Sequence, residues 1–441
     1  MDELIRDRLP FWCLWFFFSV LVLSPGPVQP ADSPVAAQKA AVGTLFLADV
    51  VRIAIENHSS IKNAQYQVNA QDAVVHQQLA AYYPRVGFTT TYRAANNGGR
   101  LSNTGKNFDN LANIDMTLYN FGKREGLVES ARDSLAATRY GYTVTANNIV
   151  LAVKQAYYGV LQANALLTVN EDTVKDRQET LRQTQGFYEV GTRPKSDLTQ
   201  AEANLYIAQA NLIAARNGVD VAWATLRNAM GVDDYPRVPL AEELALTPFP
   251  MSLDEAKKAA FAGRPELLQF DALLKAQDQL IAVARRNHLP DFLLTSTYGR
   301  TGSSSDGPVL PLQQSWQVQL SLNIPIFNGF QTTYEVQQAL FNYEATREQQ
   351  RQERQLVALQ VEQNYLNLIA ARDVVRANEA AVRAAKENLE LHEARYQVGY
   401  APIVEVTDAQ TTLTTAQTNY VNSLIAYKLS QAQLTNAIGN Q

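Results

Sequence analysis

The sequence contains few of the groups from which an active site or a metal centre is built. Its 441 residues include one cysteine and four scattered histidines without metal-ligand spacing: His58, His76, His288 and His392. It contains no phosphate-binding loop, nucleophile elbow or dinucleotide fingerprint. We therefore expect no catalysis, cofactor or metal site, and we expect each histidine to be a surface or packing residue.

Neither sign of charge dominates the chain. There are 38 basic and 43 acidic residues, which gives a formal net charge of −5. No basic cluster is interleaved with aromatic residues, the pattern expected of a nucleic-acid surface. We therefore expect no nucleic-acid partner.

An apolar run near the N-terminus, residues 11–23, is too short to predict a membrane-spanning helix. Small and proline-rich residues follow it, and this order is typical of a signal peptide, although the leader MDELIRDRLP lacks the usual positive flank. We predict a signal peptide over residues 1–37. The only cysteine, Cys13, lies within it, so the exported chain would form no disulfide.

The sequence contains two copies of one unit. At an offset of 208 residues, 15 of the 44 positions in 188–231 are identical in 396–439. A repeat of this length is the first feature that a fold prediction has to accommodate. We predict a first repeat over residues 38–231, a proline-rich joint over 232–252 and a second repeat over 253–441.

Each unit has the pattern of a helix, two strands, a long helix, a sharp turn and a second long helix. Residues 331–398 contain no Gly or Pro, so one helix of about 100 Å is expected at ~1.5 Å per residue. The turns contain Gly191 and Pro194 in the first copy, and Gly399 and Pro402 in the second. After each turn, large and small apolar residues alternate every three or four positions, which predicts a coiled-coil seam. The seam residues are Leu198, Ala201, Leu205, Ala208 and Leu212 in the first copy, and Val406, Ala409, Leu413 and Ala416 in the second.

The strands alternate between apolar and polar residues. Residues 316–324 do so without exception, and 112–119 nearly so, while 88–92 and 292–298 supply the other two strands less strictly. The Gly-rich segment 299–308 is expected to be a loop between strands. Such alternation suits a barrel strand with lipid on one side and water on the other, but also an antiparallel sheet packed on a core.

The chain offers only four such strands. Closed membrane barrels need about eight. If these strands lie in a membrane, several chains have to share one barrel.

Together the repeat, the strand pairs and the turns resemble the TolC-type outer-membrane efflux proteins. Three stretches carry the resemblance: LADVVRIAIEN (47–57), YYPRVGFTTTY (82–92) and RYQVGYAPIVEVTDAQTTL (395–413). The resemblance implies a mainly α fold with a small membrane β part and a homotrimer. Three chains would give twelve strands to one barrel in outer-membrane lipid, and their helices would form a periplasmic tunnel. A periplasmic adaptor and an inner-membrane pump would dock at the turns.

Two acidic residues follow the second turn, and in such a tunnel they would lie near its narrowest point. Glu405 and Asp408 are three residues apart on one helical face. With threefold symmetry they would form a ring of carboxylates that favours cations and binds multivalent ones. Acidic residues in a first helical turn are also favoured by the helix dipole, and that alternative stays open.

Three further residues are candidates for contacts that keep the tunnel shut: Tyr396, Asp197 and Arg193. The family commonly has Arg where this chain has Ala401 in its second turn, and the Arg of this chain lies in the first turn. The closing contacts are therefore expected to differ from the usual ones.

The resemblance favours a passive duct for the efflux of small toxic compounds. The same architecture serves as the outer-membrane channel of a type I protein secretion system. A periplasmic coiled-coil scaffold without a pore is the third alternative. The polar residues on one face of the strands favour a pore over this scaffold.

Overall fold

A computed structural model of the chain describes residues 43–97, 103–241, 246, 249–305 and 307–439. The predicted signal peptide 1–37 lies outside these residues. No helix among them is long and apolar enough to cross a membrane.

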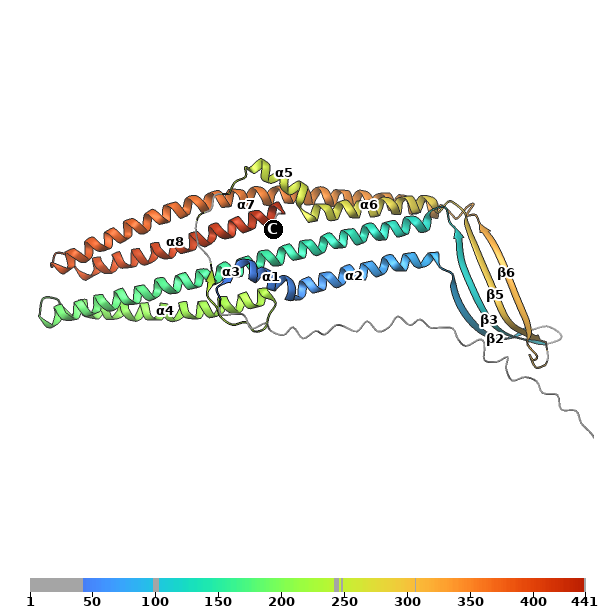
Figure 1. Ribbon diagram of the computed structural model, residues 1–441, viewed down its shortest axis with the longest axis horizontal. Coiled ribbons are helices and arrows are strands. Elements are labelled where there is room, and N and C mark those ends of the chain that lie inside the picture. Colours follow the sequence, from blue (N-terminus) through green and yellow to red (C-terminus); the bar gives the residue numbers. More distant parts are fainter. Residues whose placement is uncertain (1–42, 98–102, 242–245, 247–248, 306, 440–441) are drawn as a thin grey trace, which may run out of the picture. The chain divides into compact units, whose positions relative to one another are not determined.

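Each half of the chain contains two short helices, two strands and two long helices, in the same order (Figure 1). The first half comprises α1 (Leu47–Asn57), α2 (Ser59–Leu79), β2 (Arg85–Asn97), β3 (Asn103–Tyr119), α3 (Lys123–Glu189) and α4 (Lys195–Met230). The second half comprises α5 (Leu253–Gly263), α6 (Pro265–Arg286), β5 (Asp291–Ser304), β6 (Gln313–Asn323), α7 (Gln331–Gln397) and α8 (Ile403–Ile438). The short elements are β1 (Leu45–Phe46), η1 (Ala80–Tyr82) and β4 (Leu240–Ala241).

The long helices form two hairpins, α3–α4 (the first hairpin) and α7–α8 (the second hairpin), which Figure 1 shows as two pairs of adjacent ribbons. The predicted seams are confirmed, because most residues at the expected spacing are buried: Ala201, Leu205 and Ala208 in α4, and Val406, Ala409, Leu413 and Ala416 in α8. Leu198 and Leu212 are half-buried. Alternating large and small side chains thus bring the two helices of each hairpin together.

The short helix pairs contain a break at the same place in both halves. A glycine in the left-handed region ends each returning helix and packs on that break: Gly231 (φ +69°) and Gly439 (φ +85°). A Cβ at Gly231 would lie 2.6 Å from the Cα of His58, and one at Gly439 would lie 3.0 Å from the carbonyl carbon of Gly263. Only glycine fits both the backbone conformation and this close approach.

Two short strands tie the start of the described chain to the segment that joins the halves. β1 pairs in parallel with β4. The hydroxyl of the fully buried Tyr157 lies 3.2 Å from the carbonyl oxygen of Leu45 and 2.7 Å from that of Ala241. This α3 side chain therefore holds both strands of the pair.

The four long strands form one antiparallel sheet in the order β2-β3-β5-β6. Because residues opposite one another share a face, the register divides the sheet into two faces. The first, here called the apolar face, carries Val86, Phe88, Tyr92, Phe108, Ile114, Met116, Leu294, Tyr298, Trp316, Val318, Leu320 and Leu322. The second, here called the polar face, carries Arg85, Thr89, Thr91, Arg93, Asp109, Asn113, Asp115, Thr295, Thr297, Gln317 and Gln319.

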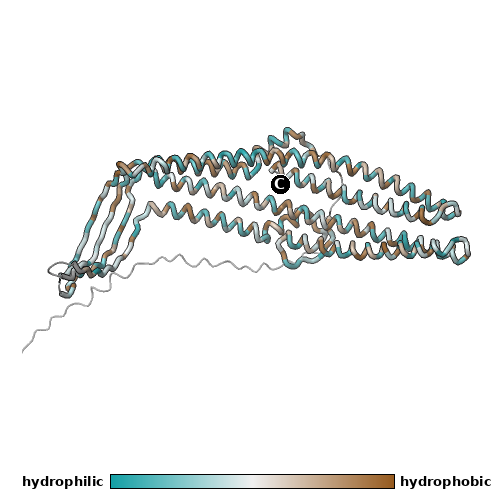
Figure 2. The backbone as a smooth tube through the Cα atoms, turned by 180° about the vertical axis from the view of Figure 1, so that it is seen from behind, coloured by the Kyte–Doolittle hydropathy of each residue, from teal (hydrophilic) through white to brown (hydrophobic). Residues whose placement is uncertain are grey.

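The predicted alternation is confirmed, and one loop prediction is wrong. Residues 299–304, expected in a loop, continue β5 and pair with β3 as far as Lys106 opposite Ser304. Their glycines allow close pairing, since a Cβ at Gly299 would overlap the backbone of Asn110. Hydrophobic and hydrophilic residues alternate along these strands in Figure 2.

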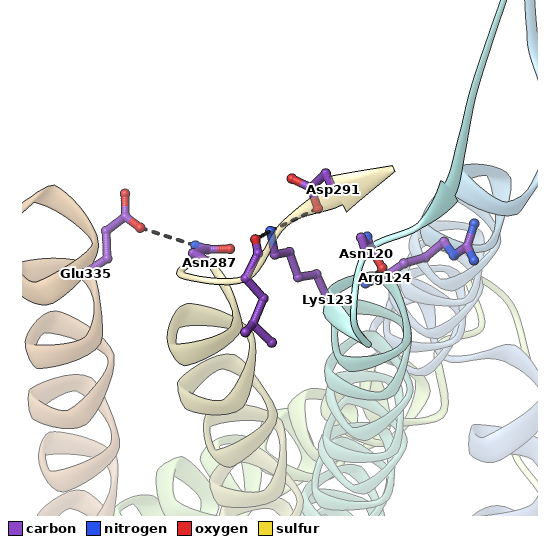
Figure 3. Close-up of polar contacts among 7 residues, drawn as sticks. Asn120, Lys123, Arg124, Asn287, Asp291 and Glu335 are labelled. Atoms are coloured by element: carbon purple, nitrogen blue, oxygen red, sulfur yellow. Dashed lines mark hydrogen bonds and ion pairs between the residues drawn. The ribbon is translucent and has the colours of Figure 1, made fainter. Parts of the chain in front are cut away.

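The sheet is attached to the helices by a cluster of polar contacts (Figure 3). The Lys123 ammonium at the start of α3 lies 2.9 Å from both the Asp291 carboxylate and the Leu289 carbonyl oxygen. Nearby, Asn287 donates to the Glu335 carboxylate at 3.2 Å. These contacts connect β5 to α3, and α6 to α7, at the end of the sheet where the strands meet the helices.

Candidate functional site: the two helix corners

The two hairpins turn through corners of the same construction. Each long helix ends at a glycine with positive φ, Gly191 at +75° and Gly399 at +86°. The next helix has a proline as its N-cap, Pro194 or Pro402. Glycine tolerates the left-handed conformation that stops a helix, and proline fixes the φ angle at the start of the next one. The predicted turn residues thus lie where the sequence placed them.

Arg193 of the first corner reaches into the second corner. Its guanidinium donates to the carbonyl oxygens of Tyr396 and Ala401, both at 3.1 Å. It also lies 4.5 Å from the centroid of the Tyr396 ring. The space beside Ala401 is therefore used by an arginine from the other hairpin.

Tyr396 of the second hairpin contacts Thr184, Phe187 and Arg193 of the first. Its side chain is 2% exposed, its hydroxyl lies 3.3 Å from the Thr184 hydroxyl, and its ring meets Phe187 edge to face. Asp197 is different. Its carboxylate lies 3.5 Å from the Ser196 hydroxyl, and no contact with the second hairpin is found among the described residues. The structure brings together two of the three predicted closing residues, Tyr396 and Arg193.

The two predicted acids have unequal surroundings. The Oε2 atom of Glu405 lies 3.0 Å from Nδ1 of His392 and 3.2 Å from the Arg395 guanidinium. Asp408 is exposed, and none of the described cations lies within ion-pair distance of it. The contact of His392 with Glu405 crosses the turn, so no helical spacing indicated it, and the prediction of a plain surface or packing histidine missed it.

Polar contacts continue along α3 and α8 away from the corners. Arg177, 8% exposed, donates to the side-chain oxygens of Gln410 at 2.6 Å and Thr411 at 2.9 Å. Gln410 in turn donates to the Thr180 hydroxyl at 2.8 Å. Further pairs join the hairpins at Thr173–Thr414 (3.2 Å) and Gln162–Asn422 (2.8 Å). We call these, with the Thr184–Tyr396 and Arg193 contacts, the inter-hairpin contacts.

Acidic side chains beside Arg177 are unusual in their titration. Burial, and then the charge of Asp172, raise the pKa of Asp176, although the neighbouring Arg177 acts in the opposite direction. Burial, and then the charge of Asp176, likewise raise the pKa of Glu393 on α7. The Asp176 carboxylate of the first hairpin thus disfavours the ionised form of Glu393 on the second. Sequence analysis missed this pair because their positions, 217 residues apart, carry no common pattern.

Comparison with known proteins agrees with this architecture. The family described as "Outer membrane efflux protein" matches residues 50–232 and 257–440, one stretch in each half. The outer membrane protein TolC of Vibrio cholerae is 27% identical over 418 residues, covering 91% of this chain and 93% of the relative. The toluene efflux pump outer membrane protein TtgC of Pseudomonas putida is 26% identical over 440 residues, covering 94% and 87%.

A solved structure shows the same fold. The CmeC outer membrane channel of Campylobacter jejuni superimposes with a TM-score of 0.76 at 18% identity, covering 89% of this chain and 85% of that one. The family match extends over most of the chain and both hairpins. The protein therefore belongs to the outer membrane efflux protein family and is a TolC-type exit duct of the outer membrane.

Proposed function

We propose that three copies of this chain assemble into one duct that carries small toxic compounds out of the cell. The observation that supports this is the sheet: it has four strands, one apolar and one polar face, and two edge strands, β2 and β6. Unpaired edges are not tolerated in lipid, because no water is present to satisfy their backbone groups. Pairing β6 of one copy with β2 of the next satisfies both edges. Three copies give twelve strands around a polar interior.

The partners follow from the same arrangement. With the sheet in the outer membrane, the corners of the hairpins face the periplasm. We propose that a periplasmic adaptor meets them there and joins the duct to an inner-membrane pump. The duct itself holds no energy source and conducts passively, so the pump chooses the compounds that are exported.

Assembly is tested on the purified protein in detergent. The expected results are a particle of three chains by light scattering, fractionation with the outer membrane, and conducting pores in planar bilayers. A particle that is monomeric and stays in solution without detergent contradicts the proposal.

We further propose that the corners close the duct and that its opening is a cation-binding constriction. Three copies bring three Asp408 carboxylates around one axis, where like charges in a narrow throat favour cations. Glu405 contributes less, because Arg395 and His392 share its Oε2 atom. Arg193, which holds Tyr396 and the Ala401 carbonyl, takes the closing role that a second-corner arginine has in the family.

The constriction is tested by single-channel current with lanthanum(III) added on the side of the corners. We expect the double change Glu405→Ala with Asp408→Ala to abolish block. Of the single variants, Asp408→Asn should raise the blocking concentration by about tenfold or more, which corresponds to ~1.4 kcal/mol, and Glu405→Gln should raise it less. Glu387→Gln, an exposed change on α7 well above the corner, is the matched control. If the double variant is blocked as readily as the parent, these acids serve only to start the helix.

A further inference from the structure

The apolar face of the sheet ends in aromatic side chains on the side away from the helices. Tyr92 and Phe108 lie on β2 and β3 with ring centroids 6.5 Å apart. Tyr298 on β5 lies opposite Trp316 on β6, and both are more than half exposed. Aromatic side chains in such a row are typical of the boundary between hydrocarbon and headgroups.

Two basic residues lie on the same face beyond Tyr298. Arg300 pairs with Asn110, and Lys106 pairs with Ser304. The register between them is unbroken, so both side chains share the face of Phe108 and Tyr298. A side-chain contact agrees with this assignment: Gln314, opposite Arg300, donates to the Tyr298 hydroxyl at 3.3 Å.

These two cations have no acidic partner within the described ranges. The acids of the sheet, Asp109, Asp115 and Asp291, lie on the polar face, where Asp115 is opposite Arg85. Among the residues that the structure describes, the polar face therefore holds charges of both signs, whereas the charged residues of the apolar face, Lys106 and Arg300, are both basic. Unpaired cations on a lipid-facing surface are costly unless they reach the headgroup region.

We propose that Lys106 and Arg300 bind a phosphate-bearing lipid headgroup in the outer leaflet of the membrane. The proposal rests on the location of the chain in the outer membrane. The helices join the sheet at its opposite end, so the end with Lys106 and Arg300 points away from the periplasm. Phosphate oxygens accept charge-assisted hydrogen bonds from both ammonium and guanidinium groups.

The spacing of the two cations indicates the kind of headgroup. Arg300 of β5 lies opposite Asn110 of β3, and Asn110 is four residues from Lys106 along β3. The two cations are therefore separated by about 14 Å along the strand direction. The long side chains of the two residues allow their charged groups to approach more closely than their backbones do. Phe108 lies between Lys106 and Arg300 on the apolar face. A headgroup with two separated phosphates on an acylated scaffold fits this arrangement better than a single phosphodiester. The aromatic row below supplies contact for its acyl chains.

The experiment uses the full protein in detergent and native mass spectrometry with two probes, lipid A and its fully dephosphorylated form. We expect the parent to retain lipid A at least tenfold more tightly than the dephosphorylated probe, since each cation near anionic lipid contributes about fivefold. Lys106→Gln with Arg300→Gln should reduce lipid A binding to the level of the dephosphorylated probe. The charge-preserving pair Lys106→Arg with Arg300→Lys should keep most of it.

The matched control is Arg93→Gln, which removes a cation from the same end of the sheet but from the polar face. It should leave lipid A binding unchanged. Equal retention of the two probes by the parent, unchanged binding in the double glutamine variant, or the same loss in Arg93→Gln would each overturn the proposal. Planar-bilayer conductance of the same samples reports separately on the duct, so failure of lipid binding leaves the proposed function intact.

Discussion

The contacts within a hairpin differ in kind from the contacts between hairpins. Inside the second hairpin, nine buried side chains form one apolar cluster near the corner: Ala385, Leu389, Tyr396, Ala401, Ile403, Val406, Ala409, Leu413 and Ala416. Between the hairpins, from Gln162–Asn422 to the corners, most direct contacts are hydrogen bonds of Gln, Asn, Thr, Tyr and Arg side chains. The exceptions lie at the Tyr396 ring, which Phe187 and Arg193 of the first hairpin contact. The boundary lies near Ile425, which still belongs to the apolar core around α1.

This difference bears on which parts of the molecule can move. Separating the two helices of one hairpin exposes apolar surface, at about 25 cal/mol per Å². Separating one hairpin from the other mainly exchanges hydrogen bonds with protein for hydrogen bonds with water, at a net cost of ~0.5–1.5 kcal/mol each, and breaks the aromatic contact of Phe187 with Tyr396. We therefore expect each hairpin to move as a rigid unit. The inter-hairpin contacts between Ile425 and the corners are weaker than the contacts within a hairpin. An opening motion would therefore separate the two hairpins there.

The largest effect is expected from a charge placed inside a hairpin. Val406 is 2% exposed, and Val406→Asp buries a carboxylate without a partner, which costs ~3 kcal/mol or more. Val404→Asp is the control, because Val404 lies two residues earlier on α8 and is 53% exposed. Thermal unfolding followed by circular dichroism should show a large loss of stability for the first variant and almost none for the second. Equal losses would contradict the rigid-hairpin picture.

A smaller effect is expected at the joint between hairpins. Arg177→Met removes the donor to Gln410 and Thr411 and should cost ~1–3 kcal/mol, because the buried Gln410 oxygen is left without that donor. Hydrogen exchange should quicken in α8 around Gln410, while the seam of the second hairpin stays protected. The control is Arg182→Met, since the Arg182 side chain is 78% exposed and pairs with Glu179 on its own helix.

A double-mutant cycle sharpens this result. Combining Arg177→Met with Gln410→Leu removes both partners, so the double variant should be more stable than the sum of the single effects predicts. Additive effects would show that the two side chains do not act together.

Periodic features of the fold could be predicted from the sequence. The absence of Gly and Pro predicted α7, the Gly and Pro pairs predicted both corners, and spacing of three and four predicted the seams. The alternation in 316–324 predicted the two faces of β6, although the strand ends at Asn323. Each of these features is a local pattern that one element carries by itself.

Features that depend on the register between distant elements could not be predicted. The extension of β5 through 299–304 depends on β3 pairing with it. The Gly- and Ser-rich composition of this segment is typical of a turn, so the sequence did not indicate a strand. Arg193 was a candidate closing residue, but its partners, the backbone carbonyls of Tyr396 and Ala401, have no sequence signature. The contacts of Glu405 with His392 and Arg395 distinguish it from Asp408, and no local pattern indicated this difference. The ring of carboxylates stays a prediction. The division of the chain at 232–252 stays a prediction.

The smallest effect concerns the acidic pair at the joint and depends on pH. Burial and the charge of Asp176 raise the pKa of Glu393 above its ordinary value of 4.5, so the folded protein holds this proton more tightly than the unfolded chain. The carboxylate therefore causes no loss of stability below pH 4.5, and its penalty develops as the pH rises towards the raised pKa.

Glu393→Gln removes the ionisation while keeping the shape of the side chain. We expect this variant to be slightly more stable than the parent at pH 7, with water screening keeping the gain small because Glu393 is only half-buried. The gain should vanish as the pH falls below 4.5. Unfolding midpoints of parent and variant between pH 4 and pH 8 give the measurement, and the exposed change Glu387→Gln should show no such trend. A variant that is less stable than the parent at pH 7, or whose advantage grows in acid, would show that Glu393 strengthens the joint as a charged group.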